Sequence, residues 1–130
     1  MKKGLVMEGG AMRCMFTAGV TDTLMKADID FDGAIGVSAG AAFGWNYKSR
    51  QIGRVLRYNV KYASDPRLSS WQSWLKTGDL YGADFCYHEL PVKLDIFDTV
   101  AFQKNSIDFW YVATDINNGE AIYHKLILGK

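Results

Sequence analysis

The 130-residue sequence is poor in cysteine and proline and lacks a long apolar run. Two cysteines, Cys14 and Cys86, are too few for a disulfide scaffold, so we expect reduced thiols in a cytoplasmic protein. Only two prolines occur, and repeats and flexible linkers are missing, which predicts a single domain over residues 1–130. The apolar run at residues 5–7 is too short for a secretory signal, and none reaches the roughly 18 residues of a spanning helix. We therefore expect a soluble protein.

An excess of charge of one sign is also missing. Fifteen Lys and Arg residues face fourteen Asp and Glu residues, for a net charge of +1, so nothing in the balance indicates a nucleic-acid partner. The apolar fraction of 48% and the aromatic fraction of 14% are typical of a packed globular interior. The composition therefore favours an ordinary globular domain over a disordered or low-complexity chain.

The order of apolar and turn residues predicts alternating strands and helices. We expect strands at 4–8 and 31–37, and a later pair at 107–116 and 120–128 joined by the Asn-Asn-Gly turn at 117–119. Helices are expected from residue 12, from residue 39 and around 52–60, with loops and short helices over 62–94. The apolar positions that indicate the first and third helices are Met12, Met15, Phe16, Val20 and Leu24, and Ile52, Val55, Leu56 and Val60. This order favours parallel βαβ units in an α/β fold.

A G-x-S-x-G pentapeptide falls where the second strand ends and the second helix begins. Gly36 and Gly40 flank Ser38 at a distance of two residues, as a sharp turn carrying a nucleophile requires, because bulky neighbours would clash there. Ser38 would also lie at a helix N-terminus, where free N–H groups favour developing negative charge. A small-residue turn selected only for close packing is the alternative interpretation.

A second glycine-rich turn follows the first strand. Gly9, Gly10 and Ala11 are followed by Arg13, about 25 residues before the serine. If the two strands are parallel neighbours, both turns emerge at one sheet edge, so the backbone N–H groups of this turn and of Ala39 can form an oxyanion hole beside Ser38. Arg13 is suited to an anionic headgroup. The turn lacks the dinucleotide-binding glycine pattern, so we expect no such cofactor.

Together the two motifs resemble the N-terminal half of a bacterial patatin-like phospholipase, and the resemblance extends to residues 65–67, 76–79 and 113–115. It implies a three-layer α/β/α fold with a mainly parallel sheet, incomplete in this chain. It also implies a serine acyl-ester hydrolase of the phospholipase A type, acting on lipid esters with a Ser-Asp dyad and no cofactor. By position, Ser38 resembles the nucleophile, residues 9–11 the oxyanion turn and Arg13 its basic residue. The family usually has glycine at the place of Ala11, which fits the turn if its φ is negative.

The catalytic aspartate of the dyad is not found in residues 1–130. Asp32-Gly33-Ala34 matches the expected triplet, but a strand of six residues puts Asp32 about 20 Å from Ser38. Asp115 ends a strand and is a weak substitute, so we expect the base beyond residue 130 and an almost inactive chain. The incomplete fold predicts an exposed sheet edge that promotes self-association.

Two other features are weaker. The acidic run at 28–33 begins like a calcium loop, but Ala39 stands where a bidentate glutamate is needed, and no zinc spacing occurs, so we expect no metal. Four basic residues share one predicted helix face and suggest peripheral contact with anionic membranes, although a solvated polar face is the simpler interpretation: Arg50, Arg54, Arg57 and Lys61. Trp71 and Trp74 are candidates for lining an acyl pocket or for contact with a membrane interface, and packing under loops is the simpler interpretation.

Two rival functions remain open. An α/β-hydrolase or acyltransferase-type esterase uses the same pentapeptide with a histidine base, for which His88 and His124 are the candidates. A non-catalytic lipid-binding or scaffold module would keep the architecture without the dyad. A histidine beside Ser38 favours the first rival, and membrane binding that is independent of Ser38 favours the second.

Overall fold

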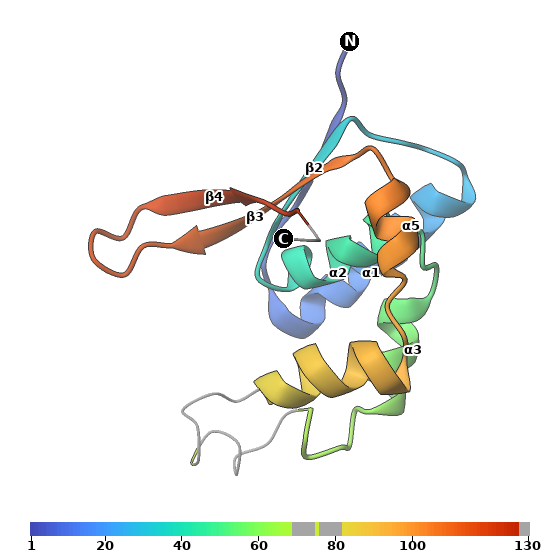
Figure 1. Ribbon diagram of the computed structural model, residues 1–130, viewed down its shortest axis with the longest axis vertical. Coiled ribbons are helices and arrows are strands. Elements are labelled where there is room, and N and C mark those ends of the chain that lie inside the picture. The colour runs from blue at the N-terminus through green and yellow to red at the C-terminus, as the bar shows by residue number, and fades with distance from the viewer. Residues whose placement is uncertain (69–74, 76–81, 128–130) are drawn as a thin grey trace. The chain divides into compact units, whose positions relative to one another are not determined.

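A computed structural model describes residues 1–68, 75 and 82–127 of the chain (Figure 1). It forms two compact units, Met1–Val55 together with Asp98–Lys130, and Leu56–Phe97. The elements follow in chain order: β1 (Gly4–Met7), the 3-10 helix η1 (Ala11–Cys14), α1 (Met15–Lys26), β2 (Gly33–Val37), α2 (Ala39–Lys48), α3 (Arg54–Lys61), the π-helix η2 (Phe85–Leu94), α5 (Thr99–Lys104), β3 (Asp108–Thr114) and β4 (Ala121–Lys125).

The sheet has the strand order β1-β2-β3-β4. Strands β1, β2 and β3 are parallel, whereas β4 returns antiparallel to β3, as the Asn-Asn-Gly turn predicts. In the register, Met7 lies beside Gly36 and Val37 lies beside Val112, so the carboxyl ends of β1 and β2 meet at one edge. The expected α/β fold with a mainly parallel sheet is confirmed.

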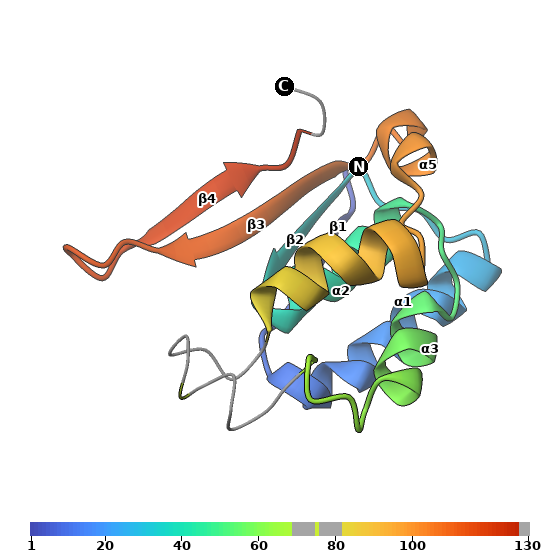
Figure 2. The same ribbon diagram turned by 60° about the horizontal axis from the view of Figure 1, so that its bottom comes forward.

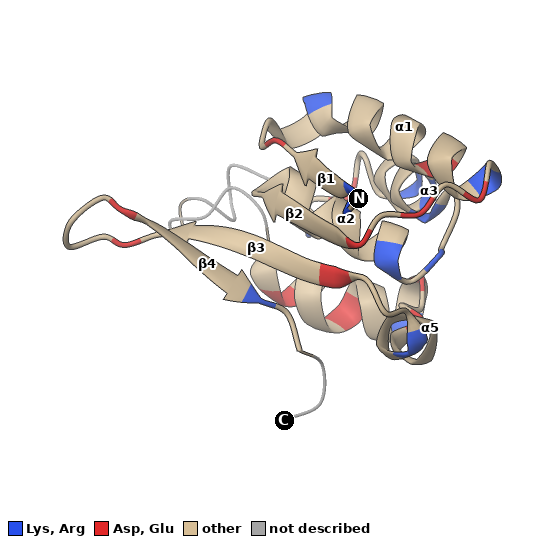
Figure 3. Cartoon of the chain, turned by 90° about the horizontal axis from the view of Figure 1, so that it is seen from above, with Lys and Arg blue, Asp and Glu red and all other residues tan. Residues whose placement is uncertain are grey.

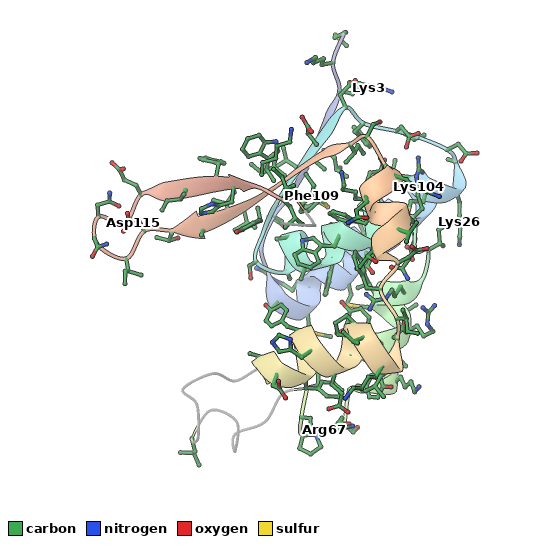
Figure 4. The ribbon with its side chains drawn as sticks, in the orientation of Figure 1. Lys3, Lys26, Arg67, Lys104, Phe109 and Asp115 are labelled. Atoms are coloured by element: carbon green, nitrogen blue, oxygen red, sulfur yellow. The ribbon has the colours of Figure 1, made fainter. Side chains whose placement is uncertain are left out.

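Helix α2 packs on one face of this sheet (Figure 2). Met7, Ala34 and Phe109, one from each parallel strand, are buried together against Trp45 of α2. Figure 4 labels Phe109 in this cluster. Gly44 brings the helix close, because a Cβ atom there would lie 2.6 Å from Met7 Cε and 2.8 Å from Phe109 Cε2. This contact fixes α2, and with it the turn that precedes it, against the strands.

The opposite face of the sheet carries exposed apolar side chains. Successive strand residues point to alternate faces, so the neighbours of the buried positions face away from α2. Val6 is 77% exposed on β1, Trp110 36% on β3 and Tyr123 60% on β4. No helix in the described ranges has the length and apolar content needed to span a membrane.

Helix α1 buries a different face from the one that its apolar residues predict. Its buried positions are Ala18, Thr21 and Met25, which recur at helical spacing and continue from the buried Cys14 at the end of η1. Phe16, at the centre of the predicted apolar face, is 80% exposed instead. Small side chains let α1 approach α2 closely, and this packing outweighs the burial of the larger residues.

The hairpin of β3 and β4 extends away from α1 and α2 (Figure 1). Gly119 has a φ of 75°, a left-handed conformation that glycine adopts without strain. Asp115 closes the turn, because its Oδ1 atom accepts from Asn117 N at 2.8 Å. The backbone N of Asp115 also donates to Glu120 O at 2.8 Å. The turn is therefore held by the side chain of Asp115.

The unit Leu56–Phe97 has its own aromatic and ionic contacts. The rings of Tyr62 and Phe85 meet edge to face at 5.5 Å, and the guanidinium of Arg67 lies 4.6 Å from the Phe85 ring. Arg67 forms salt bridges to Asp65 and Glu89 at 2.8 and 2.7 Å. The predicted roles of Trp71 and Trp74, and the motif at 76–79, lie outside the described residues.

The third predicted helix also differs from its prediction. Within α3, Val55 is buried as expected, but Leu56 and Val60 are 54% and 67% exposed. The buried positions are Arg54, Val55, Tyr58 and Asn59. The expectation of an apolar face running through residues 52–60 was therefore wrong, because tyrosine and hydrogen-bonded polar groups fill that side of the helix.

Candidate active site

Ser38 occupies a sharp turn between β2 and α2. Its φ and ψ are 51° and −122°, a left-handed backbone that costs a non-glycine residue about 1–3 kcal/mol. Its carbonyl begins the helix by accepting from Ala41 N at 3.0 Å and Ala42 N at 3.1 Å. The residue itself is exposed. This strained, solvent-accessible geometry is what a nucleophile on a strand-to-helix turn requires.

The two glycines of the pentapeptide have no room for a side chain. A Cβ atom on Gly36 would lie 2.6 Å from the Cα and N of Ala41. A Cβ atom on Gly40 would lie 2.4 Å from Glu8 O and 2.5 Å from Met7 O. The first glycine therefore lets α2 fold back over its own strand, and the second lets α2 contact the end of β1.

The glycine-rich turn after β1 lies directly beside Ser38. A Cβ atom on Gly9 would be 3.1 Å from the Cβ of Ser38 and 3.3 Å from Val37 O. The parallel register explains this contact. Met7 pairs with Gly36, and Gly9 and Ser38 each follow two residues later on their own strands. The two turns that the sequence singles out therefore meet at one edge of the sheet.

Ala11 departs from the expectation of a negative φ. Its φ is 47°, so an alanine holds the left-handed position that a glycine would adopt without cost. The turn then passes directly into η1, which starts at Ala11. The condition of a negative φ is therefore not met, and Ala11 holds a strained conformation at the junction between the glycines and η1.

Two side chains border the turn. The guanidinium of Arg13 lies over Gly10, with Nε and Nη2 each 3.5 Å from the position of a Cβ atom there. The buried Cys14 donates from Sγ to Glu8 O at 3.4 Å. Since Glu8 O also contacts Gly40, this carbonyl lies between the two turns. Sequence reasoning did not assign Cys14 to the site, because a single cysteine after the turn gives no sign of its contact with Glu8 O.

The carboxylates considered as bases have other partners. Asp32 precedes β2 at the end opposite Ser38, and its Oδ2 atom accepts from Lys3 N at 2.6 Å. Asp115 lies at the tip of the hairpin (Figure 4) and holds its own turn. Neither carboxylate is arranged as the base for Ser38.

Of the two candidate histidines, His124 has a partner of its own in the unit that holds Ser38. The ring of His124 stacks on Tyr111 at 5.1 Å within the hairpin. His88 belongs to η2 in the other unit. The described residues hold no group of three acidic, histidine or cysteine side chains that could bind a metal ion, and in the acidic run Asp30 pairs with Arg50.

Most of the basic residues expected on one face are engaged. Arg54 is 5% exposed and donates to Asn46 Oδ1 at 2.9 Å. Arg57 binds Asp95 through two hydrogen bonds of 2.7 and 2.8 Å, which raise the pKa of Arg57. These contacts bury or partly neutralise the middle of the basic face, and the peripheral membrane contact through it stays a prediction.

A cavity of about 440 Å³ lies at the opposite end of β3 from the two turns. Its lining includes Lys48, whose Nζ donates to the carbonyls of Asn105 (3.0 Å) and Ile107. Burial lowers the pKa of Lys48, and nearby Asp108 opposes this effect. Asn105 donates back to Lys48 O at 2.8 Å, so this lysine joins the end of α2 to the start of β3.

Comparison with known proteins agrees with this geometry. The family model of patatin-like phospholipases matches residues 5–123. The chain belongs to the patatin-like phospholipase family. The patatin-like chain is also 30% identical over 96 residues to the uncharacterized protein YjjU of Escherichia coli (strain K12). That match covers 70% of this chain and 27% of YjjU, so the chain spans about a quarter of this relative's length. No solved structure matches the chain.

Proposed function

We propose that the chain supplies the nucleophile and the oxyanion hole of a serine acyl-ester hydrolase acting on lipid esters. The observation that carries this proposal is the 3.1 Å approach between the Cβ position of Gly9 and Ser38 Cβ. This contact puts the backbone of the glycine-rich turn after β1 beside the side chain of Ser38. The patatin-like family supports a lipid ester as substrate.

In the proposed reaction, Ser38 Oγ attacks the carbonyl carbon of the ester. The carbonyl oxygen becomes an oxyanion, which accepts hydrogen bonds from N–H groups of Gly9, Gly10, Ala11 and Ala39. Ala39 opens α2 ahead of the first hydrogen bonds of the helix, which begin at Ala41 N and Ala42 N, so helix geometry assigns its N–H group no partner within α2. Collapse of the intermediate releases the alcohol and leaves an acyl-serine, which water then hydrolyses.

Arg13 adds positive charge beside the oxyanion turn. Its guanidinium lies over Gly10, so it is suited to the phosphate of a phospholipid headgroup. The proton of Ser38 must pass to a base, and the proposal assigns this role to a carboxylate outside residues 1–130. The chain alone should therefore hydrolyse esters slowly.

A covalent phosphonate tests the nucleophile without requiring turnover. We expect a p-nitrophenyl alkylphosphonate to form an adduct on Ser38, located by peptide mass spectrometry, with imidazole accelerating the reaction as an external base. Ser38→Ala should abolish the adduct, whereas the control Ser106→Ala should not. Labelling that persists in Ser38→Ala, or that spreads evenly over other serines, would remove the nucleophile assignment.

A further inference from the structure

Three large apolar side chains point outward from the segment formed by η1 and α1. Met12 is 50% exposed, Phe16 80% and Val20 41%. Their spacing of four residues puts them on one side of the helix. Cys14 and Ala18 lie on the opposite, buried side. We call the exposed set Met12, Phe16 and Val20 the α1 apolar face.

The α1 apolar face begins where the oxyanion turn ends. Met12 follows Ala11 directly, and Phe16 lies one helical turn farther along. The same segment carries a cation near each end, Arg13 and Lys26, against one carboxylate, Asp22 (Figure 3). Exposed apolar side chains flanked by basic residues are typical of a helix that lies in the interface of an anionic membrane.

We propose that the α1 apolar face docks on the surface of an anionic lipid aggregate. Phe16 and its two neighbours enter the boundary between headgroups and acyl chains, and Arg13 and Lys26 contact the anionic headgroups. This inference rests on the proposed function, because docking here brings lipid esters to the turn beside Ser38. A protein bound to the same face would instead cover the approach to that turn.

Vesicle binding by the 130-residue chain tests this surface. We expect phosphatidylglycerol vesicles to bind the chain more tightly than phosphatidylcholine vesicles in co-sedimentation. Phe16→Asp should weaken partitioning into phosphatidylglycerol vesicles about tenfold or more, since it replaces an inserted ring with a charge. Phe16→Ala should cause a smaller loss in the same direction. The matched control is Ile116→Asp, because Ile116 is 96% exposed in the hairpin turn.

Both positions are exposed, and far-ultraviolet circular dichroism checks that each variant folds. Equal binding by Phe16→Asp and the parent chain would overturn the proposal. So would a lipid-free dimer, measured by light scattering, that Phe16→Asp dissociates, because the occupant would then be a second copy.

Ser38→Ala distinguishes this proposal from the proposed function. It should bind vesicles as the parent chain does while losing the phosphonate adduct. If the adduct forms on Ser38 but Phe16→Asp binds vesicles normally, only the docking surface fails. If Phe16-dependent binding persists but Ser38 never reacts, the hydrolase assignment fails instead.

Discussion

Replacing Gly40 with alanine should destabilise the protein although it improves the helix. The added Cβ atom would lie 2.4 Å from Glu8 O and 2.5 Å from Met7 O, against about 3.3 Å for an ordinary carbon–oxygen contact. Relief requires the end of β1 and the start of α2 to separate by about 0.9 Å. Both oxygens belong to the backbone, so no side-chain rotation can relieve the contact.

The cost follows from known overpacking effects. Such substitutions cost about 1–3 kcal/mol, and two backbone contacts put Gly40→Ala near 3 kcal/mol. Alanine recovers at most about 1 kcal/mol of helix propensity. We therefore expect a net loss of about 2 kcal/mol in the free energy of unfolding.

Gly19 provides a matched control. It lies in α1 with no atom within 4 Å of its Cβ position, so Gly19→Ala should gain about 1 kcal/mol. Urea unfolding, followed by circular dichroism, should then separate the two variants by about 3 kcal/mol. Equal stability of Gly40→Ala and Gly19→Ala would refute the close contact between the two turns.

Two further predictions concern charged groups in the same unit. Lys48→Met should lower the free energy of unfolding by about 2 kcal/mol, because it leaves the carbonyls of Asn105 and Ile107 unpaired, and an unchanged urea midpoint would contradict this. Burial lowers the pKa of Lys48, so as the pH approaches 10.5 this lysine is more protonated in the unfolded state than in the folded state. The free energy of unfolding of the parent chain, relative to that of Lys48→Met, should therefore rise with pH in this range. The hydrogen bond from Lys125 lowers the pKa of Asp108. The ion pair therefore stabilises the folded state above the unfolded-state pKa of 3.8, and this stabilisation is lost as the pH falls through the folded-state pKa. Asp108→Asn should therefore lose less unfolding free energy than the parent chain as the pH falls below about 4. If both proteins lose stability equally over this pH range, the ion pair of Asp108 and Lys125 does not stabilise the fold.

The sequence predicted the sheet and the meeting of the two turns. Short apolar runs that end in glycine or small residues define β1 and β2, and two parallel neighbours necessarily release their turns at one edge. The hairpin followed from Asn-Asn-Gly, because Gly119 tolerates a positive φ. These features depend on local sequence and chain direction.

Helix packing could not be predicted in the same way. Along η1 and α1, both Met12–Phe16–Val20 and Cys14–Ala18 recur at helical spacing, and only the packing against α2 selects the smaller set. The sequence likewise does not reveal that Arg54 binds Asn46 or that Arg57 binds Asp95, because these partners are distant along the chain. The left-handed φ of Ala11 was also missed, because apolar periodicity carries no information about the backbone angles of a turn.

The central claim is that Ser38 and the N–H groups of residues 9–11 contact the same ligand. Amide chemical shifts of the chain phosphonylated on Ser38 test this directly. A phosphonyl oxygen bound in a shared oxyanion hole should shift the backbone N–H signals of residues 9–11 and Ala39 most strongly. Ser38→Ala treated with the same reagent should show none of these shifts. An adduct on Ser38 that leaves the signals of Gly9, Gly10 and Ala11 unmoved would contradict the account.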